Sequence, residues 1–281
     1  MINRPTPPHP GHGLAPTPTF LSIIQHNCLG SWNLFLSLFE SFKEATTYLS
    51  IVLLQDPPVN KVHLPSFNGF KSFFPPVRKP RVAAYVHMSF LSNYTVLPRF
   101  KGVDDVLALD ISADQPLFGT AFHSFRVINA YSTNTVDHRV HSVSPEDHFP
   151  DLGFPLLVLG DHNIHNALSD PLRHFSQREI SSSTPYFEKP AESGFALLNP
   201  PGEYTRFPLV GNARPSVIDL AFANPPLLPL VKSWESSLPS TDSNHIPITI
   251  TLATPSLNQK APATALGRHG LGGLGPDNQG F

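Results

Sequence analysis

A short apolar run, Leu156–Leu159, is followed directly by the polar sequence GDHNIHN at 160–166. An apolar run of this length predicts a strand that is buried on both faces, and Gly160 is expected to end it. Asp161 and Asn163 would then emerge together at a sheet edge, which is where α/β proteins keep their functional groups. The same residue types also form ordinary turns after a strand, so this motif alone leaves both interpretations open.

The other periodic segments predict many short strands and few helices. Leu21–Gln25 and Ile51–Gln55 have the pattern of strands, and Trp32–Glu44 between them places its apolar side chains on one helical face, behind an N-cap at Ser31. Further strands are predicted at Val82–Val86, Val106–Ile111, Leu117–Ala121, Arg126–Tyr131, Val217–Phe222 and Ile246–Leu252. Because strands greatly outnumber helices, we expect two packed sheets with a few helices outside them.

The two ends of the chain lack this pattern. Residues 1–19 are dominated by Pro, His, Gly and Thr, and residues 254–281 by Gly, Ala, Pro and Asn. Such segments bury too little apolar surface to offset the entropy lost on ordering them. We therefore expect a flexible arm over 1–19, one domain over 20–253 and a disordered tail over 254–281.

Composition narrows the class of protein. An apolar content of 40% in 281 residues is enough for a sizeable core, and 32 prolines favour a loop-rich fold. The formal net charge of −2 carries no chain-wide signature of nucleic-acid binding. A polyanionic substrate would therefore have to be held by local arginines or by a metal.

Cysteine usage and hydropathy bear on the compartment. Cys28 is the single cysteine, which excludes an internal disulfide and a cysteine-rich zinc site. The N-terminal residues lack the pattern of a signal peptide, and no stretch approaches the roughly 20 apolar residues that span a bilayer. We expect a soluble intracellular protein that does not associate with membranes.

Polar residues stand at the ends of several predicted strands. They are Asn27, Asp56, Tyr131, Asp161, Asn163, Asp219, Asn244 and His245. Carboxylate and amide oxygens are ligands that suit Mg²⁺, and a histidine beside a carboxylate is the usual proton carrier near neutral pH. Together these residue types predict metal-assisted attack of water on a phosphate.

Two groups of basic residues are candidates for substrate binding. Arg81 belongs to the one dense basic cluster of the sequence, and Arg206 and Arg214 lie on the segment that leads to Asp219. Such residues are often only solvated, but next to a site that acts on a phosphate they would hold a polyanionic substrate.

The ordered set of motifs resembles the endonuclease/exonuclease/phosphatase (DNase I-like) superfamily. The motifs are QHN at 25–27, LLQDP at 53–57, INAY at 128–131, GDHNIHN at 160–166, SVIDLAF at 216–222 and SNHIPI at 243–248. Residues 64–86 and 204–222 are most similar to the endonuclease domains of fungal LINE-type (non-LTR) retrotransposon reverse transcriptases. The resemblance implies an α/β (α+β) fold, namely a four-layered α/β sandwich of two packed, mostly antiparallel sheets flanked by helices.

The resemblance also implies catalytic roles. Tyr131 would contact the scissile phosphate, Asp161 would activate the attacking water, and Asn163 would hold the phosphate. Asp219 would orient the catalytic histidine, which is His245. The implied function is that of a Mg²⁺-dependent endonuclease that nicks DNA, works without a stable protein partner and acts in the nucleus.

By the same resemblance, Asn27, Asp56 and Asn244 fall at metal positions, with Mg²⁺ as the expected cofactor and Mn²⁺ as its substitute. Two of them depart from the family pattern. Asp56 stands where the family has glutamate, which retracts the carboxylate, and Asn244 stands where the family has an aspartate, which removes a negative charge. The alternative hypotheses are therefore a degenerate domain that keeps the fold without turnover, and a phosphatase or phosphodiesterase of the same superfamily.

Overall fold

The computed structural model describes residues 20–44, 49–59, 64–100, 105–114, 116–117, 122–132, 149–150, 153–209, 214–236 and 243–253. All of them belong to one of the two units into which the chain divides, Pro18–Pro255. The arm predicted over 1–19 and the tail predicted over 254–281 lie outside the described residues. Within the described part, no helix has the length and apolar character needed to cross a membrane.

The described strands form two six-stranded sheets. The first has the order β11-β12-β1-β2-β4-β3, with bounds Val231–Ser236, Ile248–Ala253, Phe20–Asn27, Leu49–Gln55, Val82–His87 and Phe70–Phe73. The second has the order β5-β6-β7-β8-β10-β9, with bounds Thr95–Arg99, Val106–Ser112, Ser124–Tyr131, Leu156–Asp161, Asp219–Ala223 and Ala196–Leu197. The pairs β1–β2 and β7–β8 are parallel and the other pairs are antiparallel, as expected for mostly antiparallel sheets.

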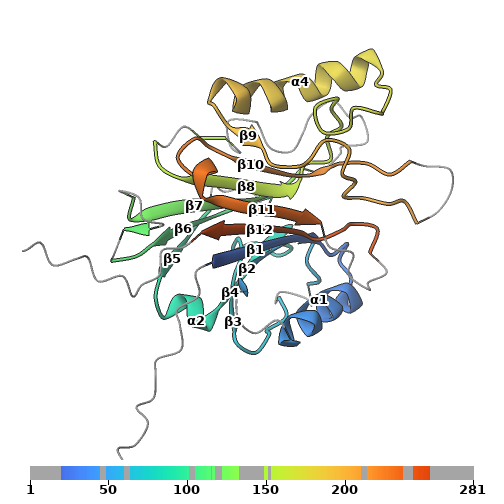
Figure 1. Ribbon diagram of the computed structural model, residues 1–281. Coiled ribbons are helices and arrows are strands. Elements are labelled where there is room, and N and C mark those ends of the chain that lie inside the picture. The colour runs from blue at the N-terminus through green and yellow to red at the C-terminus, as the bar shows by residue number, and fades with distance from the viewer. Residues whose placement is uncertain are drawn as a thin grey trace, which may run out of the picture. The chain divides into compact units, whose positions relative to one another are not determined.

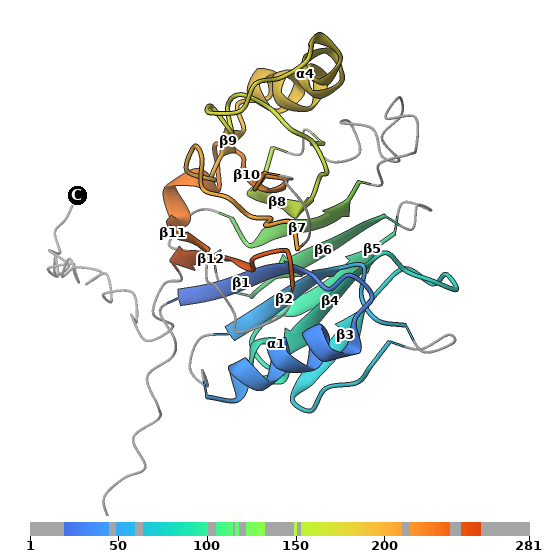
Figure 2. The ribbon, with the colours of Figure 1, turned by 90° about the vertical axis from the view of Figure 1, so that its right-hand side faces the viewer.

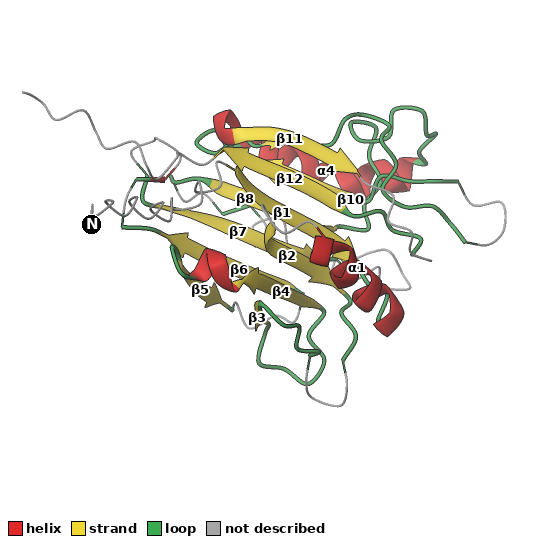
Figure 3. Cartoon of the chain, turned by 60° about the horizontal axis from the view of Figure 1, so that its bottom comes forward, coloured by secondary structure: helices red, strands yellow, loops and turns green. Residues whose placement is uncertain are grey.

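Helices cover the outer face of each sheet, which gives four layers (Figure 1). Helix α1 (Trp32–Glu44) packs on the first sheet and α4 (Gln177–Glu192) on the second, as Figure 2 also shows. Between the sheets lies the main apolar core, built from the inward side chains of both. Two short helices, α2 (Met88–Leu91) and the 3₁₀ helix η2 (Leu228–Leu230), complete the described elements in Figure 3. The predicted four-layered sandwich is confirmed.

Helix α1 forms where the apolar period predicts it. Phe35, Leu38 and Phe39 are buried against the first sheet. The hydroxyl of Ser31 accepts a hydrogen bond from the backbone N–H of Leu34 at 3.3 Å, as expected of an N-cap. Helix α4 was not predicted, because a serine run and two internal prolines, Pro185 and Pro190, hide its amphipathic pattern.

All the predicted strands except Leu117–Ala121 are present, with ends within two residues of those expected. Residues 118–121 lie outside the described part, and Leu117 is buried in the core without belonging to a strand. Strand β10 begins at Asp219 and not at Val217, because Ser216 pairs with Arg206 instead of with β8. The missed strands are β3, β5, β9 and β11.

Gly160 does not end its strand, so that prediction is wrong. Strand β8 continues through Gly160 to Asp161, and the glycine pairs with Ala130 on one side and Leu220 on the other. A Cβ at this position would lie 1.8 Å from the carbonyl oxygen of Ala130. Glycine is required here because the neighbouring backbone comes too close for any side chain.

We expect Gly160→Ala to lower the free energy of unfolding by more than about 3 kcal/mol, since only a break in the β7–β8 pairing would relieve the clash. Urea unfolding followed by far-UV circular dichroism measures the change. Gly202→Ala is the matched control, because Gly202 has a positive φ but no neighbouring atom within 4 Å. Its expected cost is about 1 kcal/mol, and equal costs for the two variants would contradict the packing argument.

Candidate active site

A cavity of about 250 Å³ lies where strand ends of the two sheets meet. Its lining includes seven of the predicted site residues: Asn27, Tyr131, Asp161, Asn163, Arg206, Asn244 and His245. Leu29, His165 and Ile218 are the other described residues of the lining. The other predicted residues do not line this cavity: Asp219 lies behind His245, Asp56 and Arg81 lie beside Tyr131, and Arg214 lines a neighbouring pocket.

The imidazole of His245 is held from behind by a buried carboxylate. Its Nδ1 lies 2.9 Å from Oδ2 of Asp219, whose side chain is fully buried. The other carboxylate oxygen of Asp219 accepts a hydrogen bond from Nε2 of Gln25 at 3.0 Å. This arrangement fixes the ring orientation and leaves Nε2 of His245 directed toward the opposite wall of the cavity.

Asp161 lies on that opposite wall. Its Oδ2 accepts a hydrogen bond from Nδ2 of Asn27 at 2.8 Å, and its Oδ1 accepts one from the backbone N–H of Asn163 at 3.0 Å. Oδ2 of Asp161 is 4.0 Å from Nε2 of His245. A carboxylate and an imidazole therefore face one another within one cavity.

The electrostatics of this pair suit proton transfer near neutral pH. Burial, together with the negative charge of Asp219, raises the pKa of Asp161 to about 7. Burial alone would lower the pKa of His245, but the charge and hydrogen bond of Asp219 outweigh it, so the pKa of His245 lies above its usual value. Asp161 thus titrates in the range where general bases work best, and the imidazolium form of His245 is stabilised by its carboxylate partner.

We expect Asp219→Asn to lower the pKa of His245 in the metal-free protein, because the carboxylate that stabilises the imidazolium is lost. The pKa of Asp161 should fall as well, since a negative neighbour disappears. An NMR titration in EDTA measures both groups. Asp110→Asn is the control, because Asp110 pairs with Arg99 and Arg126 and lines neither this cavity nor the neighbouring pocket. An unchanged His245 pKa in Asp219→Asn would refute the coupling.

A chain of buried amide side chains extends from Asp219 into the space between the sheets. Gln25 donates to Gln55 at 2.5 Å, Gln55 donates to Asn129 at 2.5 Å, and Asn129 donates to the carbonyl oxygens of Leu54 and Ala83. These three amides are not among the site residues predicted from the sequence. The signal that could have found them is a polar residue at an inward position of an otherwise apolar strand.

Arg81 contacts two of the predicted site residues. Its Nε lies 3.1 Å from Oδ1 of Asp56, and its guanidinium group stacks 4.3 Å from the ring centroid of Tyr131. Asp56 directly follows the end of strand β2 and has a positive φ of 44°. The arginine therefore neutralises one of the expected metal ligands.

The oxygen donors around the cavity fit a hard divalent cation. Oδ1 of Asn244 is buried and has no hydrogen-bond partner, although Asn244 lines the cavity. A buried oxygen without a donor is costly unless a ligand satisfies it. Asn27 lines the same cavity and adds an amide oxygen, which also accepts a hydrogen bond from the backbone N–H of Leu29 at 2.9 Å. The carboxylate of Asp56, the third predicted ligand, lies outside the cavity lining and pairs with Arg81.

Asp161, Asp219 and His245 form a second group of candidate ligands. Their ligand atoms all lie within 4.8 Å of one another. The Asp219–His245 hydrogen bond already uses two of these atoms, so the geometry favours proton transfer over metal binding for this group.

No protein-family model matches the sequence, and no curated protein matches it. Solved structures do match the fold. The endonuclease domain of TRAS1, a telomere-specific non-LTR retrotransposon, aligns with a TM-score of 0.61 and 15% identity over 83% of this chain and 98% of that one. The AP endonuclease LMAP from Leishmania major aligns with a TM-score of 0.66 and 15% identity over 84% of this chain and 89% of that one.

A third match is the 3′ phosphatase NExo from Neisseria, with a TM-score of 0.52 and 15% identity over 82% of this chain and 98% of that one. These structures belong to the DNase I-like endonuclease/exonuclease/phosphatase superfamily. At this level of identity the comparison establishes the fold, which agrees with the fold expected from the motifs.

Proposed function

We propose that this chain, which has the fold of the DNase I-like endonuclease/exonuclease/phosphatase superfamily, is a divalent-metal-dependent endonuclease that cleaves DNA phosphodiester bonds. The observation that carries the proposal is the buried Asp219–His245 pair facing Asp161 across one cavity. The similarity in fold to a retrotransposon endonuclease domain and to an AP endonuclease supports it.

The side chains divide the reaction between them. Asp161, with its pKa near neutrality, accepts a proton from the attacking water as the water oxygen bonds to phosphorus. The imidazolium form of His245, which Asp219 stabilises, donates a hydrogen bond to the phosphate, while the bond from phosphorus to the leaving oxygen breaks and that oxygen takes a proton from solvent. Tyr131 lines the same cavity, and burial raises its pKa above the usual value, so its hydroxyl stays protonated as a hydrogen-bond donor. Asn163 is fixed at the cavity by its bond to the carbonyl oxygen of Ser132.

A divalent cation supplies charge neutralisation and polarisation of the phosphate when it is bound. Asn27, Asp56 and Asn244 are the residues proposed to hold it, with Mg²⁺ as the physiological ion and Mn²⁺ as its substitute. Only one of the three is a carboxylate, and Arg81 competes for that carboxylate. We therefore expect weak Mg²⁺ binding and slow turnover.

Nicking of supercoiled plasmid by the full-length protein tests the proposal. The open-circular form should accumulate with Mg²⁺ or Mn²⁺, and EDTA should stop its accumulation. A metal titration is informative because weak binding requires millimolar ion. If the plasmid stays supercoiled at every metal concentration, the nuclease proposal fails.

The second candidate is a degenerate domain that keeps the fold without turnover. Two observations favour it: Asp56 is engaged by Arg81, and Asn244 is uncharged. A phosphatase or phosphodiesterase acting on a small substrate would use the same residues, so a chromogenic phosphomonoester is assayed alongside the plasmid. Hydrolysis of the monoester without nicking would favour that alternative.

A further inference from the structure

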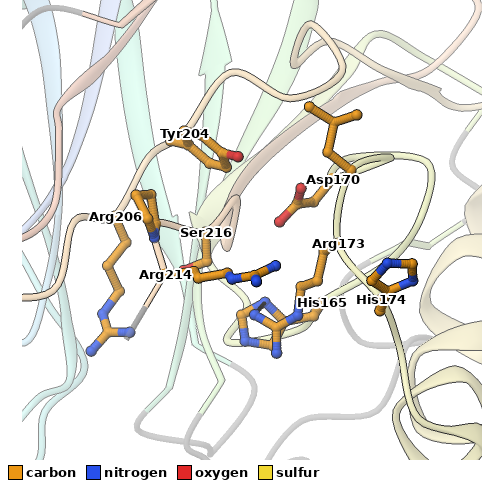
Figure 4. A pocket seen from close by; sticks show the side chains of 10 residues that line it. His165, Asp170, Arg173, His174, Tyr204, Arg206, Arg214 and Ser216 are labelled. Carbon is orange, nitrogen blue, oxygen red and sulfur yellow. Dashed lines mark hydrogen bonds between the residues drawn. The ribbon is translucent and has the colours of Figure 1, made fainter. Parts of the chain in front are cut away.

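A second pocket of about 480 Å³ adjoins the catalytic cavity (Figure 4). His165 and Arg206 line both of them, so the two spaces share a wall. Arg173 and Arg214 also line the second pocket, which gives it three arginines. No residue of this pocket except Arg206 and Arg214 was singled out from the sequence for substrate binding.

The positive charge of this pocket is only partly compensated. Arg173 is held by Glu179, with Nη2 at 2.8 Å from Oε1, but no ion pair is recorded for Arg206 or Arg214 with any residue in the described part of the chain. Arg214 is exposed and points into the pocket in Figure 4. Asp170 is the one acidic residue among the described residues of the lining. The described lining therefore holds three arginines and one acidic residue, and one of the arginines is also paired with Glu179.

His165 and Arg206 lie at the boundary between the catalytic cavity and the second pocket. Burial and the charges of Arg173 and Arg206 lower the pKa of His165 to about 4, so its ring is neutral and offers hydrogen bonds without charge. Arg206 lines both spaces, together with His165. Arg206 thus marks the passage between the catalytic cavity and the second pocket.

Ser216 supplies an unsatisfied donor at the back of the pocket. Its side chain is 1% exposed, and its hydroxyl has no hydrogen-bond partner. The backbone of Ser216 pairs with Arg206 in both directions, at 2.9 and 3.0 Å, so the hydroxyl is held in place. A buried hydroxyl without a partner costs free energy, which a ligand oxygen would recover.

We propose that this second pocket binds a backbone phosphate of the nucleic acid next to the phosphate that is cleaved. The inference rests on the proposed function, and it adds a residue, Arg173, and a hydroxyl, Ser216, to the substrate-binding surface. Phosphate is the chemistry that matches, because guanidinium groups bind its oxygens in a planar, bidentate manner. A substrate with at least two phosphates is thereby favoured over a phosphomonoester.

Binding of a short fluorescein-labelled DNA duplex, measured by anisotropy in EDTA over a series of salt concentrations, tests this proposal with the full-length protein. Arg214→Gln should weaken binding about tenfold at low salt, and the slope of log Kd against log salt should fall by about one. Ser216→Ala should weaken binding with an unchanged slope, because it removes a neutral donor. Its thermal stability should not fall, since the hydroxyl is unsatisfied.

Two further variants complete the design. Lys232→Gln removes the same charge from β11, outside both spaces, and should change Kd by less than about twofold. Asp170→Asn removes the one carboxylate of the pocket and should tighten binding; weaker binding would instead indicate a ligand with donor groups and overturn the phosphate assignment. Inorganic phosphate is titrated in parallel. Binding of inorganic phosphate that depends on Arg214, with duplex binding that does not, would assign the pocket to a free anion and overturn the proposal.

The failures of the two proposals are distinguishable. If the wild type binds duplex and Arg214→Gln behaves like Lys232→Gln, the phosphate pocket is refuted while the nuclease proposal stands. If the wild type binds no duplex and nicks no plasmid, the proposed function is refuted, and the pocket assignment falls with it.

Discussion

Asp161→Asn is expected to reduce plasmid nicking about 10³-fold, the range for loss of a general base. The carboxylate of Asp161 combines a pKa of about 7 with a position 4.0 Å from the ring of His245. Asparagine keeps the shape of the side chain and removes its ability to accept a proton. Gel quantification of open-circular plasmid over time measures the rate, and Asp114→Asn, at an exposed acid outside the cavity, is the matched control.

Stability separates loss of catalysis from loss of fold in this variant. The pKa of Asp161 is higher in the folded protein than its usual value, so the folded state holds a proton that the unfolded state has released. Wild-type stability in EDTA should therefore fall as the pH rises from the usual aspartate pKa to about 7. Asp161→Asn lacks this decline and should have the higher Tm at neutral pH. A variant that is inactive and also less stable would leave Asp161 without a demonstrated catalytic role and contradict the prediction.

Asn244→Asp is expected to increase activity, which is unusual for a substitution in an active site. Oδ1 of Asn244 is buried without a partner in the catalytic cavity, and a carboxylate there would add the charge that an oxygen site for Mg²⁺ needs. We expect Mg²⁺ to bind about tenfold more tightly. Nicking at low Mg²⁺ should rise in proportion.

Isothermal titration with Mg²⁺ or Mn²⁺ measures binding independently of turnover. Asn93→Asp is the control, because Asn93 is exposed and lines neither the cavity nor the second pocket. A gain in nicking would show that the missing charge at position 244 limits the activity of the wild type. It would argue against a domain that lost turnover through changes elsewhere. If metal affinity does not change, Asn244 is not a metal ligand.

The expected strands and α1 could be predicted because their signals are local. The apolar run of β8 and the helical face of Phe35, Leu38 and Phe39 depend only on residues close in sequence. Helix α4 was not predicted because its local signals are weak. Its Ser176–Glu179 capping box is a clear start signal, but its prolines and serines weaken the period, and packing on the second sheet decides that it forms.

The role of Gly160 could not be predicted from its neighbours in sequence. Glycine after an apolar run is usual at a strand end, but here the carbonyl of Ala130, thirty positions away, excludes a side chain within the strand. The contacts of Arg81 could not be predicted from neighbouring residues either. A basic cluster is expected to be solvated or to hold DNA, whereas the guanidinium group of Arg81 contacts Asp56 and Tyr131.

The strands, the helix α1 and the polar residue types at the strand ends follow from the sequence, since hydrophobic period and turn chemistry act over a few residues. Which of these side chains meet depends on how the chain folds. Asp161 and His245 are far apart along the chain. They lie close together because the two sheets pack face to face and are joined by the hydrogen bonds of the buried amides. The pairing of Arg81 with Asp56 and the arginine pocket beside the cavity are likewise set by distances across the fold, because electrostatic interactions depend on separation in space and not along the chain.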